Sequence, residues 1–392
     1  MDHPELRLKP HEERRLRAGH LWVYSNEIDI VKTPLGALAA GTLCRLVDSR
    51  SKALGLAYVN PHTLLSARLL TSNASAVIDA AWFERRIRSA LTLRERLYDT
   101  PHYRLVYGES DGLPGLVIDR YGAVCVVQIA TAGMEQLKAP MLEGLKLALK
   151  PAGILLRNDV GMRETEGLES YVEEIGEVPD TVEIDEAGVR IEVPVKTGQK
   201  TGWFYDQRSN RDQLAKYVAG KTVLDVFSYL GGWSLRALAA GAKSAVALDS
   251  SASALEGAAR NAALNGMTLE TIQAKALDTL REMRVHQRKF DVVIVDPPAL
   301  IKRKKDLEPG SAHYGALNKT AIDVLAPEGI LISCSCSHHM EADALQRILL
   351  RESRTAGRRL QILAQGGQGP DHPVHPAIPE TRYLKAYFCR VP

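Results

Sequence analysis

The most constraining feature of the sequence is a regular alternation of apolar runs and amphipathic segments after Val189. Runs rich in Val, Ile and Leu predict strands that are buried on both faces, and the segments between them carry apolar residues at helical spacing. In chain order these segments are TVLDVFS, WSLRALAAGA, SAVALDS, ALEGAARNAALNG, FDVVIVDPP, a helix near 315–325, and GILISCSCS. The alternation predicts a doubly wound α/β domain over residues 189–392, with its ligands beyond the carboxyl ends of the parallel strands.

The rest of the chain predicts two more domains, in line with 392 residues at about 150 residues per domain. Residues 1–72 contain short β-branched and aromatic runs separated by Gly, Pro, Asn and Asp, which predict a small β-barrel. Residues 73–188 begin with an amphipathic helix between Asp79 and Leu97 and continue with strand-like runs and a helix near 133–149. This pattern predicts a central α+β domain.

The composition excludes several classes of protein. With 45% apolar and 25% charged residues, the chain is typical of a folded globular protein. No run approaches the roughly 18 apolar residues that a membrane span needs, and the first residues are too charged for a secretory signal, so we expect a cytoplasmic protein with no membrane partner. The five cysteines form no C-x-x-C pair and the histidines form no H-E-x-x-H motif, so the sequence indicates neither a disulfide framework nor a metal site.

The charge is unevenly distributed along the chain. Residues 1–72 carry 10 Lys/Arg and 7 Asp/Glu, residues 73–190 carry 13 and 20, and residues 191–392 carry 27 and 20. Basic outer parts around an acidic middle are a weak indication of a polyanionic partner, because ordinary surface charge of this size gives the same pattern.

The first motif is LDVFSYLGGWS at residues 224–234. Asp225 lies in the expected strand, and Gly231 allows a close turn past a ligand, although the turn is not the G-x-G-x-x-G of nicotinamide enzymes. Asp249 ends the next expected strand, where a carboxylate commonly accepts hydrogen bonds from ribose hydroxyls. Asp278 follows the run TIQAKA and suits either an adenine amino group or the cap of a helix that starts at Thr279. Together these residues predict a cofactor that contains a nucleoside.

The second motif is DVVIVDPPAL at residues 291–300. An apolar strand delivers Asp296 to the sheet edge, and the two prolines after it fix an extended, stiff backbone. A rigid carboxylate beside a cofactor can position a planar base. The run IKRKK follows at once, and its four cations either form solvated surface or bind nucleic-acid phosphates.

The third motif is GILISCSCSHHM at residues 329–340, where two cysteines alternate with serines at the end of an expected strand. Cys334 is more simply explained as a small buried residue. Cys336 lies further out, where a strand end meets solvent and a thiol can react.

These motifs resemble motifs I, IV and VI of class I S-adenosylmethionine-dependent methyltransferases. With VKTGQKTGWFYDQRSNR, YGESDGLPGLVIDRYG and HPAIPETRYLKAYFCRV, the chain resembles the bacterial large-subunit (23S) rRNA cytosine-5 methyltransferase I family over nearly its whole length. The resemblance implies an N-terminal PUA RNA-binding barrel, a central α+β domain and a Rossmann-like catalytic domain that ends in the antiparallel strand YLKAYFCRV. Members of this family are often dimers, so a homodimer is a further expectation.

The resemblance also implies roles for the site residues. It assigns Asp296 and the nucleophile Cys336 to catalysis, with Cys334 as the alternative position in the overlapping S-C-S units. S-adenosylmethionine is the implied cofactor, and the residues implied to bind it are Asp225, Phe227, Ser228 and Gly231 at the methionine end, Asp249 at the ribose and Asp278 at the adenine.

Carbon chemistry supports a nucleophilic thiol, because C5 of a pyrimidine takes a methyl group only after a thiolate has added to C6. The target base must then be unpaired or flipped out of its helix. Two alternatives stay open: methylation of a base nitrogen, for which Asp-Pro-Pro suffices and Cys336 only packs, and an RNA-binding ribosome-assembly factor without turnover. A dehydrogenase is disfavoured because its glycine fingerprint is missing.

Overall fold

The computed structural model describes residues 3–392, which form two compact units. The first unit contains the chain up to Val182, together with Pro194–Trp203 and Pro370–Thr381. The second unit contains Glu183–Val193, Phe204–Gly369 and Arg382–Pro392. The chain therefore passes between the units several times, and the three-domain division at residues 72 and 188 stays a prediction.

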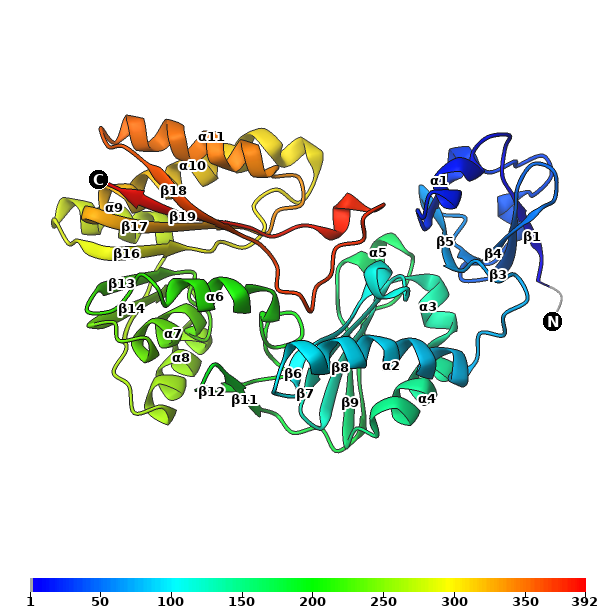
Figure 1. Ribbon diagram of the computed structural model, residues 1–392, viewed down its shortest axis with the longest axis horizontal. Helices are drawn as coiled ribbons and strands as arrows, with labels where there is room; N and C mark the ends of the chain where they lie inside the picture. The colour runs from blue at the N-terminus through cyan, green and yellow to red at the C-terminus, as the bar shows by residue number, and fades with distance from the viewer. Residues whose placement is uncertain (1–2) are drawn as a thin grey trace. The chain divides into compact units, whose positions relative to one another are not determined.

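The N-terminal part of the first unit is a five-stranded sheet in the order β1-β3-β4-β5-β2 (Figure 1). Its elements are β1 (Glu5–Arg7), α1 (Glu13–Arg17), β2 (Trp22–Tyr24), β3 (Leu43–Val47), β4 (Ala53–Val59) and β5 (Leu65–Thr71). The first strand pairs in parallel with β3, and the other pairs are antiparallel. The sheet surrounds its own apolar core, which includes Leu6, Val23 and Leu46. This arrangement agrees with the predicted β-rich N-terminal domain, although β1 and α1 were not expected.

The second part of this unit packs helices on another five-stranded sheet, in the order β10-β9-β8-β7-β6. Its elements are α2 (Ala80–Leu97), β6 (His102–Tyr107), β7 (Leu116–Tyr121), β8 (Val124–Ile129), α3 (Ala132–Gln136), α4 (Lys138–Leu149), β9 (Gly153–Asn158), α5 (Met162–Thr165) and β10 (Tyr171–Gly176). The predicted amphipathic helix is confirmed as α2, which begins after Asp79 because the Asp79 side chain accepts a hydrogen bond from the Trp82 amide at 2.8 Å. Trp82, Phe83 and Ile87 are buried against the sheet.

The second unit is built on a seven-stranded sheet in the order β15-β14-β13-β16-β17-β19-β18. Its strands are β13 (Thr222–Val226), β14 (Ser244–Asp249), β15 (Glu270–Gln273), β16 (Phe290–Val295), β17 (Leu325–Ser335), β18 (Gln361–Gly366) and β19 (Lys385–Val391), beside a hairpin of β11 (Val182–Glu186) and β12 (Val189–Val193). Its helices are α6 (Arg208–Leu214), α7 (Gly232–Ala239), α8 (Ala252–Leu264), α9 (Ala276–Val285), α10 (Leu307–Asp323) and α11 (Ala342–Thr355). Strands β13 to β17 are parallel, and β19 is antiparallel to β17 as the resemblance implies.

Both faces of this sheet are covered, because successive residues of one strand enter different cores. Val293 and Val295 of β16 pack with apolar side chains of α9, α10 and α11. Val292 and Ile294 of the same strand pack with side chains of α6 and α7. Figure 1 shows the helices on the two sides of the sheet. The predicted doubly wound α/β domain is therefore confirmed, and its parallel strands all end at one edge.

Between residues 3 and 392, the structure contains no helix of the length and apolar character that crossing a membrane would require.

Candidate active site

Four predicted site residues lie at the carboxyl ends of neighbouring parallel strands. Asp225 is the penultimate residue of β13, and Asp249 is the last residue of β14. Asp296 directly follows β16, and Cys336 directly follows β17. Since these strands are parallel neighbours in the order β14-β13-β16-β17, their four side chains belong to one edge of the sheet.

Asp225 is fully buried and only half satisfied. Its Oδ2 accepts hydrogen bonds from the Ser234 amide at 3.1 Å and from the Ser234 hydroxyl at 2.8 Å, whereas its Oδ1 has no partner among the described residues. Burial raises the pKa of Asp225 to about 7, against the lowering effect of the Ser234 hydrogen bonds. A buried carboxylate oxygen without a donor is a suitable acceptor for a ligand that carries hydrogen-bond donors.

The loop after β13 holds a strained backbone. Phe227 and Tyr229 have φ values of 68° and 49°, in the left-handed region that side chains with a Cβ rarely adopt. The amides of Phe227 and Ser228 donate to the Leu248 carbonyl at 2.9 and 3.2 Å, which ties the loop to the end of β14. The Ser228 hydroxyl is buried and has no partner among residues 3–392. Gly231, the N-cap of α7, has a φ of 80°, which glycine adopts without a conformational penalty.

Asp249 faces the same loop. Its Oδ2 accepts a hydrogen bond from the Tyr229 amide at 3.0 Å, and its Oδ1 accepts one from the Ser251 amide at 2.9 Å. Each carboxylate oxygen can accept a second hydrogen bond, so the oriented and partly exposed Asp249 side chain retains capacity for ligand hydroxyls.

Asp278 stands apart from this group. It lies in the first turn of α9, its side chain is 63% exposed, and it pairs with Arg281 at 3.5 Å. The helix begins at Ala276, so the alternative that Asp278 caps a helix starting at Thr279 is wrong. Its assignment to the adenine stays a prediction.

The Asp296 carboxylate is held firmly from two sides. Both of its oxygens accept hydrogen bonds from Gln207 Nε2 at 2.9 Å, and Oδ2 also accepts one from Trp233 Nε1 at 3.0 Å. Gln207 and Trp233 are each 3% exposed, so their own positions are fixed by packing. The carboxylate is therefore oriented before any substrate arrives.

The two cysteines of the third motif have different environments. Cys334 lies within β17, is fully buried beside Ile332 and Phe388, and has a pKa raised far above its ordinary value by burial. Cys336 lies beyond the strand end and is partly exposed, with its Sγ 3.8 Å from the Pro297 carbonyl oxygen. The structure therefore places the partly exposed thiol of Cys336 against the Asp-Pro-Pro segment, whereas the thiol of Cys334, which also interacts with Asp296 and Gln207, is fully buried.

The residues on either side of Cys336 are clamped. Ser335 donates a hydrogen bond to the Tyr314 hydroxyl at 2.9 Å, and the Ser337 hydroxyl lies 3.0 Å from the same Tyr314 oxygen. The Ser337 hydroxyl also accepts a hydrogen bond from the Ile301 amide at 3.1 Å. Since Ser335 and Ser337 are fully buried, the backbone around the thiol is held in one conformation.

Sequence reasoning did not assign Gln207, Trp233 or Tyr314 to the site. Trp233 lies inside the first motif, and Gln207 lies in the polar run YDQRSNR, which is buried although its composition suggests surface. Polar residues in a segment that must be buried are the one signal that could have indicated Gln207.

The residues present fit S-adenosylmethionine. Its ammonium and hydroxyl groups are donors, and the edge offers the unpartnered Asp225 Oδ1, the Ser228 hydroxyl and the Asp249 carboxylate as acceptors. The same part of the chain provides the tight glycine turn that lets a ligand approach the backbone.

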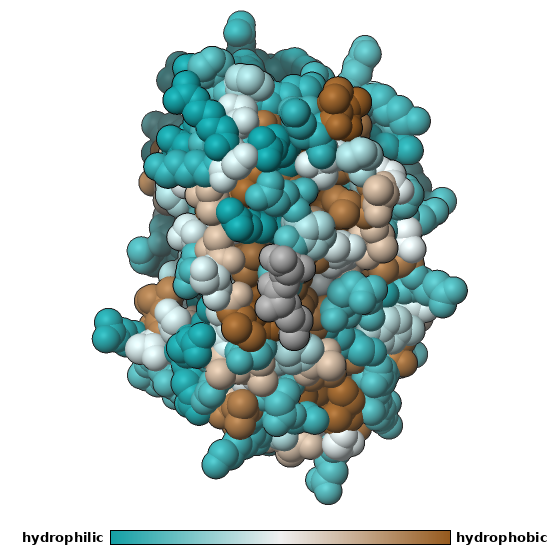
Figure 2. Space-filling model, turned by 90° about the vertical axis from the view of Figure 1, so that its right-hand side faces the viewer, coloured by the Kyte–Doolittle hydropathy of each residue, from teal (hydrophilic) through white to brown (hydrophobic). Residues whose placement is uncertain are grey.

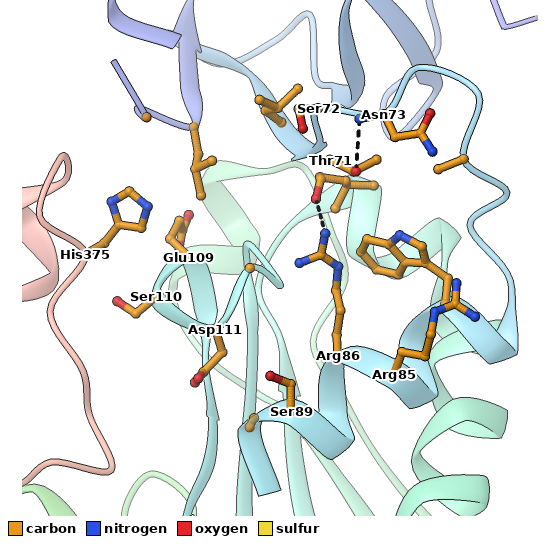
Figure 3. Close-up of a pocket in the computed structure, with 18 of the residues that line it drawn as sticks. Thr71, Ser72, Asn73, Arg85, Arg86, Ser89, Glu109, Ser110, Asp111 and His375 are labelled. Carbon is orange, nitrogen blue, oxygen red and sulfur yellow. Dashed lines mark hydrogen bonds between the residues drawn. The ribbon is translucent and has the colours of Figure 1, made fainter. Parts of the chain in front are cut away.

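A separate cavity of about 980 Å³ lies in the first unit (Figure 3). Helix α2 contributes Arg86, whose guanidinium lies 4.3 Å from the centre of the Trp82 ring and donates to the Leu70 carbonyl at 3.1 Å. Glu109 and Asp111 lie on its opposite wall, where Figure 3 also shows His375. The cavity contains none of the predicted catalytic residues, so it does not compete with the sheet edge as the site of chemistry.

Two parts of the chain with a basic sequence carry exposed cations. Residues 302–305 of the run IKRKK are exposed in the segment after the two prolines. On the N-terminal barrel, Arg15, Arg17 and Arg45 are each more than 40% exposed. Figure 2 shows that hydrophilic residues predominate on the face of the first unit turned to the viewer, with hydrophobic residues in small separate groups. Both regions present charge that a polyanion could contact.

Family models match both ends of this architecture. Residues 162–386 match the S-adenosylmethionine-dependent methyltransferase family, and residues 6–72 match the PUA-like domain family.

Curated relatives match over the full length. The chain is 37% identical over 396 residues to ribosomal RNA large subunit methyltransferase I of Klebsiella pneumoniae strain 342, which covers 99% of this chain and 98% of that one. It is 37% identical over 391 residues to the protein of the same name from Pseudoalteromonas atlantica, with 98% of each chain covered.

Solved structures agree on the fold. A candidate SAM-dependent methyltransferase from Streptococcus mutans superposes with a TM-score of 0.83 at 20% identity, covering 99% of this chain and 100% of that one. The candidate methyltransferase SMU.776, solved in complex with SAH, superposes with a TM-score of 0.84 at 20% identity over 100% of both chains.

Proposed function

The chain belongs to the ribosomal RNA large subunit methyltransferase I family of S-adenosylmethionine-dependent methyltransferases, and we propose that it methylates C5 of a cytosine in large-subunit rRNA through a covalent bond from Cys336 to C6. The observation that carries this proposal is the placement of Cys336. It is a partly exposed thiol at the end of β17, in contact with the carbonyl oxygen of Pro297, the residue that follows the oriented Asp296 in the sequence.

Cys336 would act as the nucleophile. The electron pair of its thiolate forms a bond to C6, and the π pair of the C5–C6 double bond shifts to C5, which becomes nucleophilic. The neighbouring Cys334 does not suit this role, because its side chain is fully buried and burial raises the pKa of its thiol far above the ordinary value.

Asp296 would hold the pyrimidine in place. Gln207 and Trp233 fix its carboxyl group, so the ionised form can accept a hydrogen bond from the N4 amino group, and the protonated form can donate its proton to N3, without first reorganising. Stabilising the charge that develops on the ring during thiolate addition lowers the barrier to that addition.

The carboxyl edge of the sheet would hold the methyl donor. When bound, S-adenosylmethionine supplies an electrophilic methyl group on its sulfonium. Asp225, Ser228 and the turn from Phe227 to Gly231 would hold its methionine end, and Asp249 would accept hydrogen bonds from its ribose. Asp278 would bind the adenine. Once C5 carries the methyl group, its proton passes to solvent water, the C5–C6 double bond forms again, and the C6–S electron pair returns to Cys336.

The remaining parts of the chain would bind the RNA around the target. The PUA-like barrel and the exposed cations at 302–305 suit the phosphates of the surrounding strand. The target cytosine must leave its helix to reach a thiol that sits at the edge of a sheet.

Nucleoside mass spectrometry of large-subunit rRNA tests this function. In cells that lack the protein, one 5-methylcytosine should disappear, and the wild-type chain should restore it. Cys336→Ala should fail to restore it, with a loss of at least about a thousandfold in rate, because no other thiol reaches the base.

Cys334→Ala is the matched control, since it removes the neighbouring thiol from the buried strand, and it should restore the modification. Restoration of 5-methylcytosine by Cys336→Ala would reject Cys336 as the nucleophile. Loss of a nitrogen-methylated base instead of 5-methylcytosine in the deleted strain would favour methylation of a base nitrogen. An unchanged set of modifications in the deleted strain would reject rRNA as the substrate.

A further inference from the structure

A lysine on the last strand reaches the loop that carries the proposed nucleophile. Lys385 begins β19, where it pairs with Ser335 of β17 in the antiparallel register. Its ammonium donates hydrogen bonds to the carbonyl oxygens of Ser337 and Tyr383, both at 2.7 Å. Lys385 therefore binds the residue directly after Cys336 and pairs with the residue directly before it.

This lysine is buried without a carboxylate partner. It is 9% exposed, and within residues 3–392 no carboxylate oxygen lies within 4 Å of its ammonium. Elsewhere in the chain, buried cations such as Arg94 and Arg68 form close ion pairs with Asp111 and Glu166. A buried ammonium is costly unless a negative charge or a full set of acceptors compensates it, so an anion that forms near Lys385 would be stabilised.

We propose that Lys385 is a positioning residue whose buried ammonium group holds Cys336 as a thiolate, ready to attack the pyrimidine. The proposal rests on the proposed function, in which Cys336 is the nucleophile. Two of the three ammonium hydrogens are used on carbonyl oxygens, which fixes the nitrogen beside the loop and leaves the third for the sulfur.

The charge balance of the reaction explains why a cation suits this position. Before the substrate binds, the thiol proton passes to water and the thiolate is balanced by the ammonium. When the sulfur bonds to C6, its negative charge moves to the ring; when the C6–S bond breaks, the electron pair returns to the sulfur and meets the same cation. Lys385 would thus stabilise the thiolate at the start and at the end of each turnover.

The surrounding groups agree with this arrangement. Burial lowers the pKa of Lys385 to about 8, and the acidic groups that oppose this effect are Cys336 and then Glu341 at the start of α11. Tyr314 of α10 and Cys334 of β17 also interact with this thiol, and burial raises the pKa of both, so both are neutral at pH 7. Asp296, which follows β16, interacts electrostatically with Cys334 of β17 and raises the pKa of that buried thiol further.

The test is the pH dependence of Cys336 alkylation in the full-length protein. Iodoacetamide is reacted over a range of pH, and fragment-ion mass spectrometry separates Cys336 from Cys334 on their shared peptide. The wild-type midpoint should fall below the roughly 8.5 of a free thiol. Lys385→Met, which keeps the length but loses the charge, should raise the midpoint by about one pH unit and slow alkylation at pH 7 about tenfold.

Two further variants separate charge from packing. Lys385→Arg retains the cation and should return the alkylation rate at pH 7 to within about threefold of wild type. Lys221→Met removes a half-exposed cation at the other end of the sheet, where Lys221 pairs with Asp291, and should leave the midpoint unchanged.

Either of two results would overturn the proposal: a folded Lys385→Met protein with the wild-type midpoint, or a wild-type midpoint at or above that of a free thiol. The second needs no variant and stands even if Lys385→Met does not fold. Full methylation by Cys336→Ala would instead reject the proposed function, whereas the alkylation midpoint would still report whether Lys385 controls the thiol.

Discussion

Two buried charged groups, one in each unit, differ in how completely their hydrogen-bonding atoms are paired. In the first unit, Arg94 is fully buried and donates to both carboxylate oxygens of Asp111 at 2.7 Å and to the carbonyl oxygens of Arg104 and Asp371. In the second unit, Asp225 is just as buried, yet one of its carboxylate oxygens has no partner among the described residues.

The difference separates a group that holds the fold from one that is kept for a ligand. A paired and hydrogen-bonded buried charge avoids the desolvation penalty, whereas an unpartnered buried oxygen costs stability in the unliganded protein. Asp225 lies beside the unpartnered Ser228 hydroxyl and the strained loop at Phe227 and Tyr229, all at one sheet edge. Unsatisfied groups that gather at one edge indicate where the ligand binds.

The largest effect expected from this comparison is on stability. Arg94→Met leaves the Asp111 carboxylate buried without its cation and should lower the free energy of unfolding of the first unit by about 3–5 kcal/mol. Native-state hydrogen exchange of the β6 and β7 amides measures this loss. Arg88→Met on the same helix removes a half-exposed pair with Glu84 and should cost only about 0.5 kcal/mol. Equal effects of the two substitutions would show that burial of the ion pair is unimportant.

A smaller effect is expected on cofactor binding, whose Kd should change with pH as Asp225 ionises. Because the pKa of Asp225 is raised to about 7, its carboxyl group is mostly protonated at pH 6 and mostly ionised at pH 8. A ligand ammonium needs the ionised form, so the Kd for S-adenosylhomocysteine should be about tenfold higher at pH 6 than at pH 8 by calorimetry.

Two variants sharpen this measurement. Asp225→Asn should bind S-adenosylhomocysteine more weakly, with a Kd that no longer changes between pH 6 and 8. Asp249→Asn should also bind it more weakly, but its Kd should still change with pH as in the wild type. The raised pKa also means that ionising Asp225 costs stability as the pH rises through 7, so the unliganded wild type should lose stability from pH 6 to 8 relative to Asp225→Asn. A wild-type Kd that does not change with pH would contradict the placement of Asp225 at the ammonium.

The helices and strands that could be predicted are those whose own sequence carries a hydrophobic pattern or a capping residue. Strand β16 is a continuous apolar run, and α2 has a strong apolar stripe with an N-cap, so both were found from the sequence. Strands β10 and β18 were missed because they are mostly exposed and lack the alternation of apolar and polar residues that predicts a strand. They are strands only because a neighbouring strand pairs with them, which is information that local sequence does not hold.

The site divides in a similar way. Asp225, Asp296 and Cys336 could be proposed because each ends a recognisable strand, and parallel strands bring their ends to one edge. Gln207 and Lys385 could not, because Gln207 meets Asp296 across 89 residues and Lys385 reaches Ser337 across 48. Only the folded backbone creates those contacts. The distinction between Cys334 and Cys336 also required the structure, since β17 ends at Ser335, between them.

The most direct test of the central claim is a covalent trap. Large-subunit rRNA transcribed with 5-fluorocytidine and incubated with S-adenosylmethionine should become bonded to the protein, because fluorine at C5 cannot leave as a proton does. Intact-protein mass spectrometry after denaturation should find this adduct on Cys336 in the wild type and in Cys334→Ala, and should not find it in Cys336→Ala. A wild-type protein that methylates unmodified rRNA but forms no adduct, or that forms one on another residue, would contradict the account.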